Sequence, residues 1–311
     1  MALFPVVITL LIEQFRPLPV QQWVVEPLTR FFDFLDRQFN DGRYQHGVVA
    51  WVAGVILPTL LVGAVHFALF RVSWMAALIF SVVVLYVTMG IRQYSHYFTD
   101  IQFALRSGDL DNARRLIAEW RGLSGDRVSS NGVARLAIEQ ALADSHRMVF
   151  APLVCFALLG PAGAVLFRLA LFARERWRRP KTEVAMFGLE NHFGDFSQRA
   201  FHWINWLPLR LTAMGFAIAG DFEDAVFCWR TQAATWGEAE TGILIASGAG
   251  ALGVRLGMPV QEGFGVEERP DMGMDDDADV DFMQSTVGLI WRTLALFLMV
   301  LALIWVASWV G

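Results

Sequence analysis

One stretch decides how this chain can fold: Trp203-Ile-Asn-Trp-Leu-Pro-Leu-Arg-Leu-Thr-Ala-Met-Gly-Phe-Ala-Ile-Ala-Gly220. It is apolar enough for lipid, yet it contains Asn205 and Arg210 and is interrupted by Pro208. Proline suits the first turn of a helix and glycine its left-handed end, so we expect a short helix between Pro208 and Gly220. About a dozen residues at a rise of about 1.5 Å are too short for a bilayer core of about 30 Å.

Two interpretations of this short helix follow from its composition. It is the wall of an intramembrane pocket with a buried Arg210, or it is an amphipathic helix that lies flat on the membrane while Arg210 reaches the headgroups. Periodicity alone favours neither interpretation.

The composition is that of an integral membrane protein. Of 311 residues, 55% are hydrophobic and 18% are charged, whereas soluble domains have about 25% charged residues. The net charge of −5 and the lack of a long basic face exclude nucleic acid as a partner. Cys155 and Cys228 are isolated, which predicts buried thiols and no zinc site or disulfide. We predict no metal site.

The chain is expected to fold as an all-α, polytopic integral membrane protein with about four to six membrane segments, short re-entrant or interfacial helices and soluble helical loops. Hydropathy divides it into five regions. They are an N-terminal anchor, interfacial helix and transmembrane hairpin (1–91), a soluble helical loop (92–147), a pocket region with membrane-embedded helices (148–261), an acidic solvated linker (262–286) and a C-terminal transmembrane helix (287–311).

The hairpin consists of Val49–Phe70 and Trp74–Ile91, each about 20 apolar residues long. Met148–Phe172 is also apolar, but Gly160-Pro-Ala-Gly163 interrupts it. This segment either crosses the membrane or turns back at Gly160. The basic cluster Arg174–Lys181 belongs in the cytoplasm by the positive-inside rule, so the two alternatives place residues 92–147 on opposite sides.

Three short motifs have a structural and a chemical interpretation. Gly108-Asp109 and Gly220-Asp221 each precede a helix and predict repeated N-caps, although the repeat also fits an old duplication. Gly248-Ala-Gly-Ala-Leu-Gly253 matches a dinucleotide fingerprint, but no βαβ context surrounds it, which favours close helix packing.

Charged residues flank this glycine-rich segment. Glu238 and Glu240 precede it, and capping is a better explanation for them than cation binding. Arg255 follows it and either snorkels or holds an anionic group.

Together these phrases resemble a superfamily that comprises the CobD/CbiB cobinamide-phosphate synthases and the related AmpE membrane proteins. The phrases are Gly108-Asp-Leu-Asp-Asn-Ala-Arg114, Ala151-Pro-Leu153, Phe193-Gly194, Asn205-Trp-Leu-Pro-Leu-Arg-Leu-Thr212 and Gly250-Ala-Leu-Gly-Val-Arg-Leu-Gly257. Leu11-Ile-Glu-Gln14, the hairpin and the final span look more like AmpE. The resemblance favours an inward-facing Arg210.

The resemblance implies a synthase that attaches aminopropanol to adenosylcobyric acid through an amide, with ATP and a divalent cation. Much of the polar pattern of that family is replaced here. Of its E-x-x-x-E-N-T-x-D-G motif, only the first glutamate, Glu139, remains in place. A pair of aspartates becomes Phe201 and His202, and N-T-L-D becomes Leu171-Phe-Ala-Arg174. S-P-N-A-G becomes Glu238-Ala-Glu-Thr-Gly242.

The loss of these polar residues predicts a non-catalytic, multi-pass inner-membrane protein without cofactors. Its expected role is sensing or regulation in cell-wall or β-lactamase control. The alternative is a divergent adenosylcobinamide-phosphate synthase that uses ATP and Mg²⁺. The expected partners are the lipid bilayer and a small-molecule or cell-wall-derived ligand, and a homo-oligomer is compatible with the sequence. The candidate pocket residues are Glu139, Asn205, Arg210, Glu238, Glu240 and Arg255.

Overall fold

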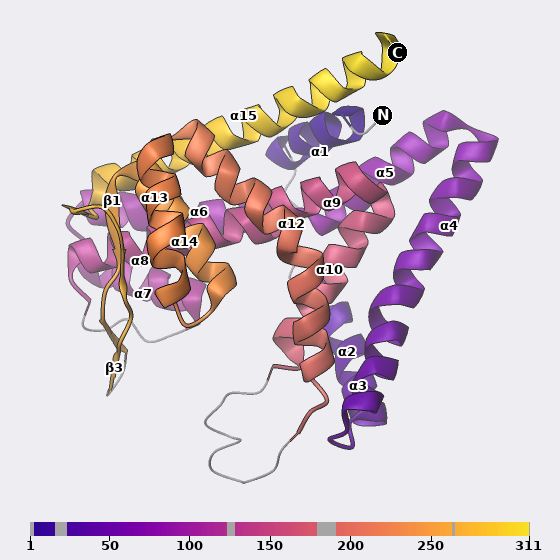
Figure 1. The fold of residues 1–311 in the computed structure, drawn as a ribbon, viewed down its shortest axis with the longest axis horizontal. Helices are drawn as coiled ribbons and strands as arrows, with labels where there is room; N and C mark the ends of the chain where they lie inside the picture. Colours follow the sequence, from indigo (N-terminus) through magenta and orange to yellow (C-terminus); the bar gives the residue numbers. More distant parts are fainter. Residues whose placement is uncertain (1–2, 16–23, 123–127, 179–190, 263–264, 311) are drawn as a thin grey trace. The chain divides into compact units, whose positions relative to one another are not determined.

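The computed structural model describes residues 3–15, 24–122, 128–178, 191–262 and 265–310. The described chain is mainly helical, with short strands only after residue 253 (Figure 1). By length and composition, three of the described helices can cross a membrane: Tyr44–Val72, Ser130–Leu159 and Val280–Ala307. The expectation of an all-α membrane protein is thus confirmed.

The chain divides into two compact units. The first unit comprises residues 1–90 and 151–208, and the second comprises residues 91–150 and 209–311. The predicted pocket region 148–261 is therefore shared between the two units.

The first unit consists of helices. They are α1 (Leu3–Phe15), α2 (Glu26–Phe39), α3 (Tyr44–Trp51), α4 (Leu57–Val72), α5 (Trp74–Thr88), α9 (Ala151–Leu159), α10 (Pro161–Arg176) and the first part of α12 (Asp195–Ala219). Only Ser73 separates α4 from α5, and the two helices pack as the expected hairpin (Figure 1). α5 ends at Thr88 and is shorter than the span expected there, because the chain leaves the helix at Met89.

The apolar segment 148–172 turns back on itself. Gly160 has a φ of +64° and separates α9 from α10, which pack against each other. A Cβ atom at Gly163 would lie 2.0 Å from the carbonyl oxygen of Cys155, so only glycine allows this close approach. The chain therefore turns back at Gly160, and the side of the membrane on which residues 92–147 lie stays a prediction.

A cluster of aromatic side chains forms the core of the first unit. The rings of Phe32 and Trp177 are 5.4 Å apart, and those of Phe167 and Phe201 are 5.5 Å apart. A π-helical turn, Val52–Ile56, joins α3 to α4 and includes Gly54, which lies directly against the side chains of α2. The aromatic residues thus bring α2, α10 and α12 together.

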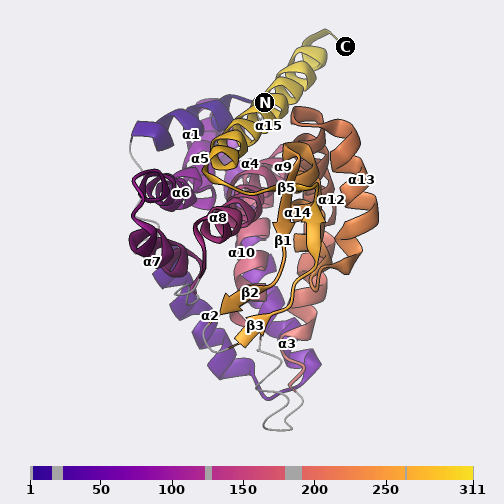
Figure 2. The ribbon, with the colours of Figure 1, turned by 90° about the vertical axis from the view of Figure 1, so that its left-hand side faces the viewer.

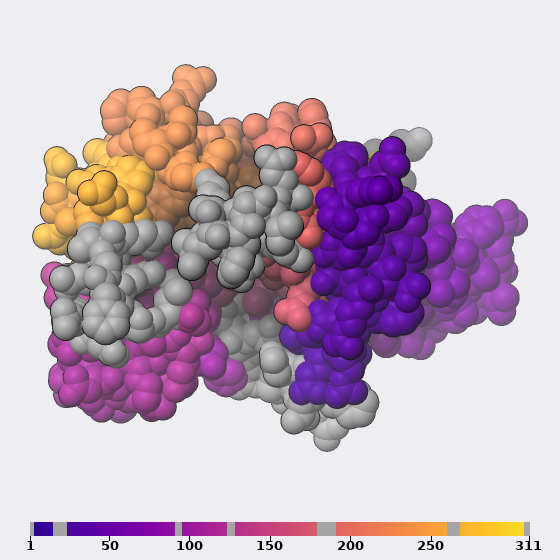
Figure 3. All heavy atoms as spheres, turned by 90° about the horizontal axis from the view of Figure 1, so that it is seen from below, coloured from indigo at the N-terminus to yellow at the C-terminus, as the bar shows by residue number. Residues whose placement is uncertain are grey.

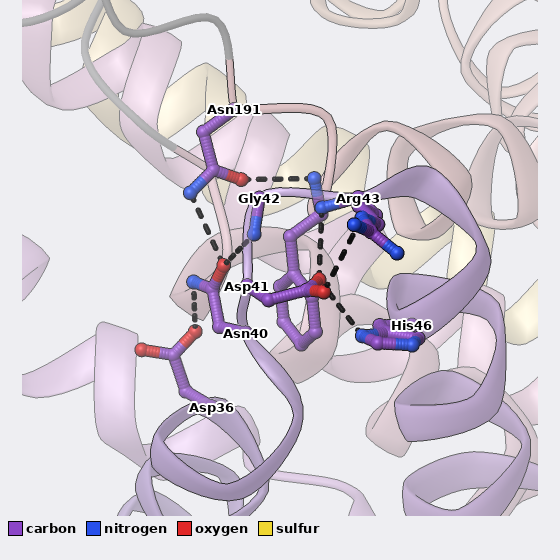
Figure 4. Close-up of polar contacts among 8 residues, drawn as sticks. Asp36, Asn40, Asp41, Gly42, Arg43, His46 and Asn191 are labelled. Atoms are coloured by element: carbon purple, nitrogen blue, oxygen red, sulfur yellow. Dashed lines mark hydrogen bonds and ion pairs between the residues drawn. The ribbon is translucent and has the colours of Figure 1, made fainter.

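The loop between α2 and α3 is held by polar contacts (Figure 4). The Asn40 side chain donates to Asp36 at 2.8 Å and accepts from Asn191 at 3.1 Å, while Asp41 contacts His46 at 2.8 Å. In Figure 3, purple atoms of the N-terminal region lie against salmon atoms of the region around residue 200. These bonds fix the start of α12 against α3.

The second unit combines helices with a small amount of sheet. Its helices are α6 (Ile91–Arg106), α7 (Leu110–Arg121), α8 (Ser130–Ser145), the end of α12, α13 (Phe222–Gln232), α14 (Ala239–Leu252) and α15 (Val280–Val310). Its strands are β1 (Val254–Gly257), β2 (Val260–Glu262), β3 (Gly265–Glu267), β4 (Asp271–Gly273) and β5 (Asp276–Asp277).

The strands form two small sheets (Figure 2). β1 lies between β4, which is antiparallel to it, and β5, which is parallel, while β2 and β3 form a separate antiparallel pair. The expected acidic linker, 262–286, therefore contains paired strands, and α15 begins inside it at Val280. The backbone of β1 supplies the hydrogen-bonding partners that order this segment.

The helix that includes Pro208 is longer than expected. α12 has 25 residues, begins at Asp195 and keeps Pro208 in its interior, so the prediction of a start at Pro208 was wrong. Proline lacks one backbone N–H, and a long helix tolerates this loss where neighbouring groups compensate for it. The length argument against a membrane-crossing helix no longer holds for this segment.

Both predicted aspartate caps are present. The Asp109 carboxylate accepts from the Asn112 N–H at 3.2 Å, and the Asp221 carboxylate accepts from the Asp224 N–H at 3.1 Å. These caps begin α7 and α13.

We expect Asp221→Ala to lower the free energy of unfolding by about 1 kcal/mol, because a first-turn N–H of α13 loses its partner. Thermal unfolding in detergent measures this change. The control is Asp100→Ala on the exposed surface of α6, which should change stability by less than about 0.5 kcal/mol. Equal effects of the two substitutions would contradict a role for the cap.

Candidate functional site

The glycine-rich segment forms the middle and end of α14. A Cβ atom at Gly248 would lie 2.6 Å from Leu142 of α8, and one at Gly250 would lie 2.5 Å from the Asp224 carbonyl oxygen at α13. Gly253 ends the helix with a φ of +70°. The fingerprint therefore lies within a packed helix and not at a turn from strand to helix, as the packing interpretation predicted.

Glu139 lies on α8, one of the helices against which α14 packs. It is 4% exposed, and both of its oxygens have partners. Oε1 accepts from the Gly257 N–H at 2.9 Å, and Oε2 accepts from Arg269 Nη1 at 2.7 Å. Arg269 is also buried, and it stacks over the ring of Trp236. This is a buried ion pair between segments 130 residues apart.

Around this ion pair the backbone makes a tight turn. Gly257 has a φ of +78°, and a Cβ atom there would lie 2.0 Å from the Pro270 carbonyl oxygen. The Arg269 guanidinium donates to the carbonyl oxygens of Gly257 and Met258, each at 3.3 Å. Glu139 and Arg269 together therefore fix the end of β1.

A cavity of about 510 Å³ lies next to this turn in the second unit. Ser129, Asn131 and Arg135 line it from the start of α8, Arg255 and Met258 from β1 and the residue after it, and Asp277 from β5. Arg255 forms an ion pair with Asp277, and this contact raises the pKa of the arginine. Arg135 Nη1 contacts the Met258 sulfur at 3.0 Å.

The predicted pocket residues are only partly brought together. Glu139 and Arg255 both lie at β1 and the cavity. Arg210, which is partly exposed, belongs to the second unit, whereas the buried Asn205 belongs to the first. Their predicted roles stay predictions.

The two other predicted glutamates lie at the start of α14. Glu238 is its N-cap residue, but its side chain bonds no backbone N–H of the helix. It instead accepts a hydrogen bond from the Thr241 hydroxyl at 2.7 Å. Glu240 lies in the first turn, where a carboxylate is favoured by the helix dipole.

Sequence reasoning missed a row of buried polar residues at the end of α8. Asp144 accepts from Trp120 at 2.9 Å and from Gln140 at 3.1 Å, and His146 shares a hydrogen bond of 2.9 Å with Thr212. Ser145 lies between them and is fully buried. These polar residues interrupt an Ala- and Leu-rich helix, a pattern that could have identified them.

Two departures from the family pattern contact each other in the first unit. The Arg174 guanidinium lies 4.8 Å from the centre of the buried Phe201 ring, and Arg174 Nε donates to Gln198 at 3.3 Å. Positions that would supply carboxylates in the resembled synthases thus form a packed cation–π contact here.

The described residues contain no cluster that would hold a metal ion through protein ligands alone. Within the described ranges, no three His, Cys, Asp or Glu side chains come close enough to hold a metal ion. Glu139 is already bonded by Arg269 and Gly257. Magnesium in nucleotide enzymes is usually held by one or two carboxylates together with substrate phosphates, and Asp277 is a carboxylate that lines the cavity.

Several curated proteins resemble this chain along most of its length. It is 32% identical over 280 residues to a protein of Stutzerimonas stutzeri (strain A1501), and the match covers 88% of each chain. It is 37% identical over 200 residues to a protein of Chromobacterium violaceum, with 63% of this chain and 61% of the relative covered. Both relatives are named cobalamin biosynthesis protein CobD. No solved structure matches.

These relatives contradict the expectation of a non-catalytic sensing or regulatory protein. That expectation treated the replaced acidic residues as a loss of chemistry. The names of the relatives instead favour the alternative, which lies in cobalamin biosynthesis. Nothing in the comparisons supports a role in cell-wall or β-lactamase control, or a closer relation to AmpE.

The family comparison covers nearly the whole chain. The profile of the family described as CobD/Cbib protein matches residues 8–290, which include both units and every predicted pocket residue. It extends from α1 into α15. The chain therefore belongs to the CobD/CbiB family.

Proposed function

We propose that this protein acts in cobalamin biosynthesis as the amide-forming synthase that joins aminopropanol to adenosylcobyric acid. The family suggests a biosynthetic enzyme, and the relatives are named for this pathway. We further propose a multi-pass location in the inner membrane, with the lipid bilayer and small-molecule substrates as partners.

One observation about the site supports this proposal most strongly. Glu139, the one retained residue of the family's acidic motif, and the family-like phrase Gly250–Gly257 are far apart in the sequence, yet they meet through the hydrogen bond from the Gly257 N–H to Glu139. Arg255, from the second phrase, lines the adjacent cavity. Retained residues thus converge on one place that has room for a ligand.

The cavity offers cationic side chains to a reaction in which the carboxyl substrate and ATP are anionic. An amide forms when an amine attacks a carboxyl carbon that ATP has activated, and the carboxyl oxygen then leaves with the phosphate group to which it is bound. Positioning of the reactants supplies much of the rate in such a step, and fixed donors stabilise the developing negative charge. Arg135 and Arg255 are suited to hold anionic groups in this way.

Expression of the gene should restore cobalamin-dependent growth to a bacterial strain that lacks its own synthase. The measurement is growth without added cobinamide or cobalamin. The Stutzerimonas stutzeri relative, expressed in the same strain, is the positive control, and the empty vector is the negative one. A well-expressed, membrane-inserted protein that fails where the relative succeeds would refute the proposal.

A further inference from the structure

We infer that the corner at which α12 meets α13 binds the lipid bilayer, with its exposed apolar side chains inserted among the lipids beside α15. Neither the end of α12 nor α13 belongs to the three described helices that are long and apolar enough to cross a membrane. The corner is therefore a membrane contact in addition to those helices. It lies entirely within the second unit, and its binding to lipid is independent of the proposed synthase reaction.

The end of α12 exposes one apolar side. Leu211, Met214 and Ile218 follow one another at helical spacing, so they share a side of the helix, and each is between 38% and 54% exposed. The side chains of Ala213 and Phe216, elsewhere on the same helix, are fully buried. Large apolar side chains that are exposed in a continuous row indicate a binding surface, whereas isolated ones do not.

The exposed apolar surface continues on α13. Only two residues separate the helices, and Phe222, the first residue of α13, is 54% exposed. Val226 and Trp229 follow on the same side of α13 and are partly exposed. Ile218 and Phe222 thus stand on either side of the corner, and apolar side chains are exposed on both helices.

The sequence of α15 marks the level at which the bilayer begins. Trp291 and Arg292 are exposed on this helix, and the sequence from Thr293 to Val310 contains no charged residue. Tryptophan is enriched at the membrane–water interface, and arginine extends its charged end toward the headgroups there. The hydrocarbon region therefore begins close to Arg292.

The end of α12 lies beside α15 (Figure 1 and Figure 2). A Cβ atom at Gly215 would lie 2.8 Å from the Thr293 side chain and 2.9 Å from the Phe297 ring. These two residues of α15 follow Arg292 within about 8 Å along the helix axis, at a rise of about 1.5 Å per residue. Ile218 is one turn beyond Gly215 on the surface of α12. The exposed side of α12 therefore lies at the edge of the bilayer.

Charged residues at the corner favour the edge of the bilayer over its interior. Asp221 and Glu223 are exposed on either side of Phe222 in the sequence, and Arg230 is exposed further along α13. Charged side chains are costly within the hydrocarbon region, but a helix in the interface buries its apolar side while its charged side chains stay in water. The bilayer therefore covers the apolar side chains of the corner and leaves these three charges solvated.

The test is the accessibility of nitroxide spin labels on the full-length protein in phosphatidylcholine nanodiscs that hold one molecule each. Oxygen concentrates in lipid, whereas a nickel chelate stays in water. Relative to the chelate, oxygen should collide several times more often with labels at Ile218→Cys and Phe222→Cys than with a label at Arg115→Cys on the exposed surface of α7. Leu303→Cys on α15 is the lipid-facing control. The wild-type chain, whose two cysteines are buried, gives the background.

Two results would overturn the inference. If the labels at Ile218→Cys and Phe222→Cys are as accessible to the chelate as the label at Arg115→Cys, the corner faces water. If oxygen and the chelate are both excluded from these labels in nanodiscs that hold two molecules, a second copy of the chain covers the corner. Met214→Cys places a label on the same side of α12 and replaces either variant that fails to fold, with the same expected result and the same contrary ones.

Discussion

Glu139→Ala is expected to lower the free energy of unfolding by about 3–5 kcal/mol, the range observed when one partner of a buried ion pair is removed. The substitution leaves the Arg269 guanidinium buried without its carboxylate, and the Gly257 N–H loses its acceptor as well. Both lost interactions stabilise the turn after β1. Thermal unfolding in detergent measures the effect, and Glu119→Ala on the exposed surface of α7 is the control.

A double-substitution cycle separates the charge from the packing. In the wild type, Arg269→Met should destabilise the protein. In the Glu139→Ala variant, the same substitution should restore part of the lost stability, because it removes the uncompensated charge. If the two changes in the free energy of unfolding were strictly additive, the ion pair would contribute nothing to the stability of the second unit.

The partner of Glu139 could not be predicted from the sequence. The glutamate itself was identified, because it stands in the only retained position of an acidic motif. Arg269 lies 130 residues away in an acidic segment that was expected to be a solvated linker. Strands of two to four residues show too little alternation to be recognised by periodicity, so the order in this segment depends on pairing with β1.

The helices were more predictable than the site. Long apolar runs and aspartate caps are local features, and they placed the α4–α5 hairpin and the starts of α7 and α13. The start of α12 was mispredicted, because a proline is favoured at a helix start and yet is also tolerated inside a long helix.

Gly250→Ala is the second substitution with a large expected effect. A methyl group there would lie 2.5 Å from the Asp224 carbonyl oxygen and 2.7 Å from the Ala225 Cα atom. Both are backbone atoms of α13, so a rotamer change cannot relieve the clash, and the two helices must move apart. Overpacking of this kind costs about 1–3 kcal/mol and sometimes more, and we expect a loss of about 3 kcal/mol.

Gly288→Ala on α15 is the matched control for this prediction. It makes the same change inside a helix, but nothing lies within 4 Å of the added methyl group. Alanine is the better helix former by about 1 kcal/mol, so this variant should be slightly more stable than the wild type. Because the chemical change is identical, opposite signs in the thermal unfolding of the two variants would isolate the packing of α14 against α13. A stability loss in Gly250→Ala no larger than that in Gly288→Ala would show that the two helices can separate at little cost, and the close packing assigned to the glycine-rich segment would then be wrong.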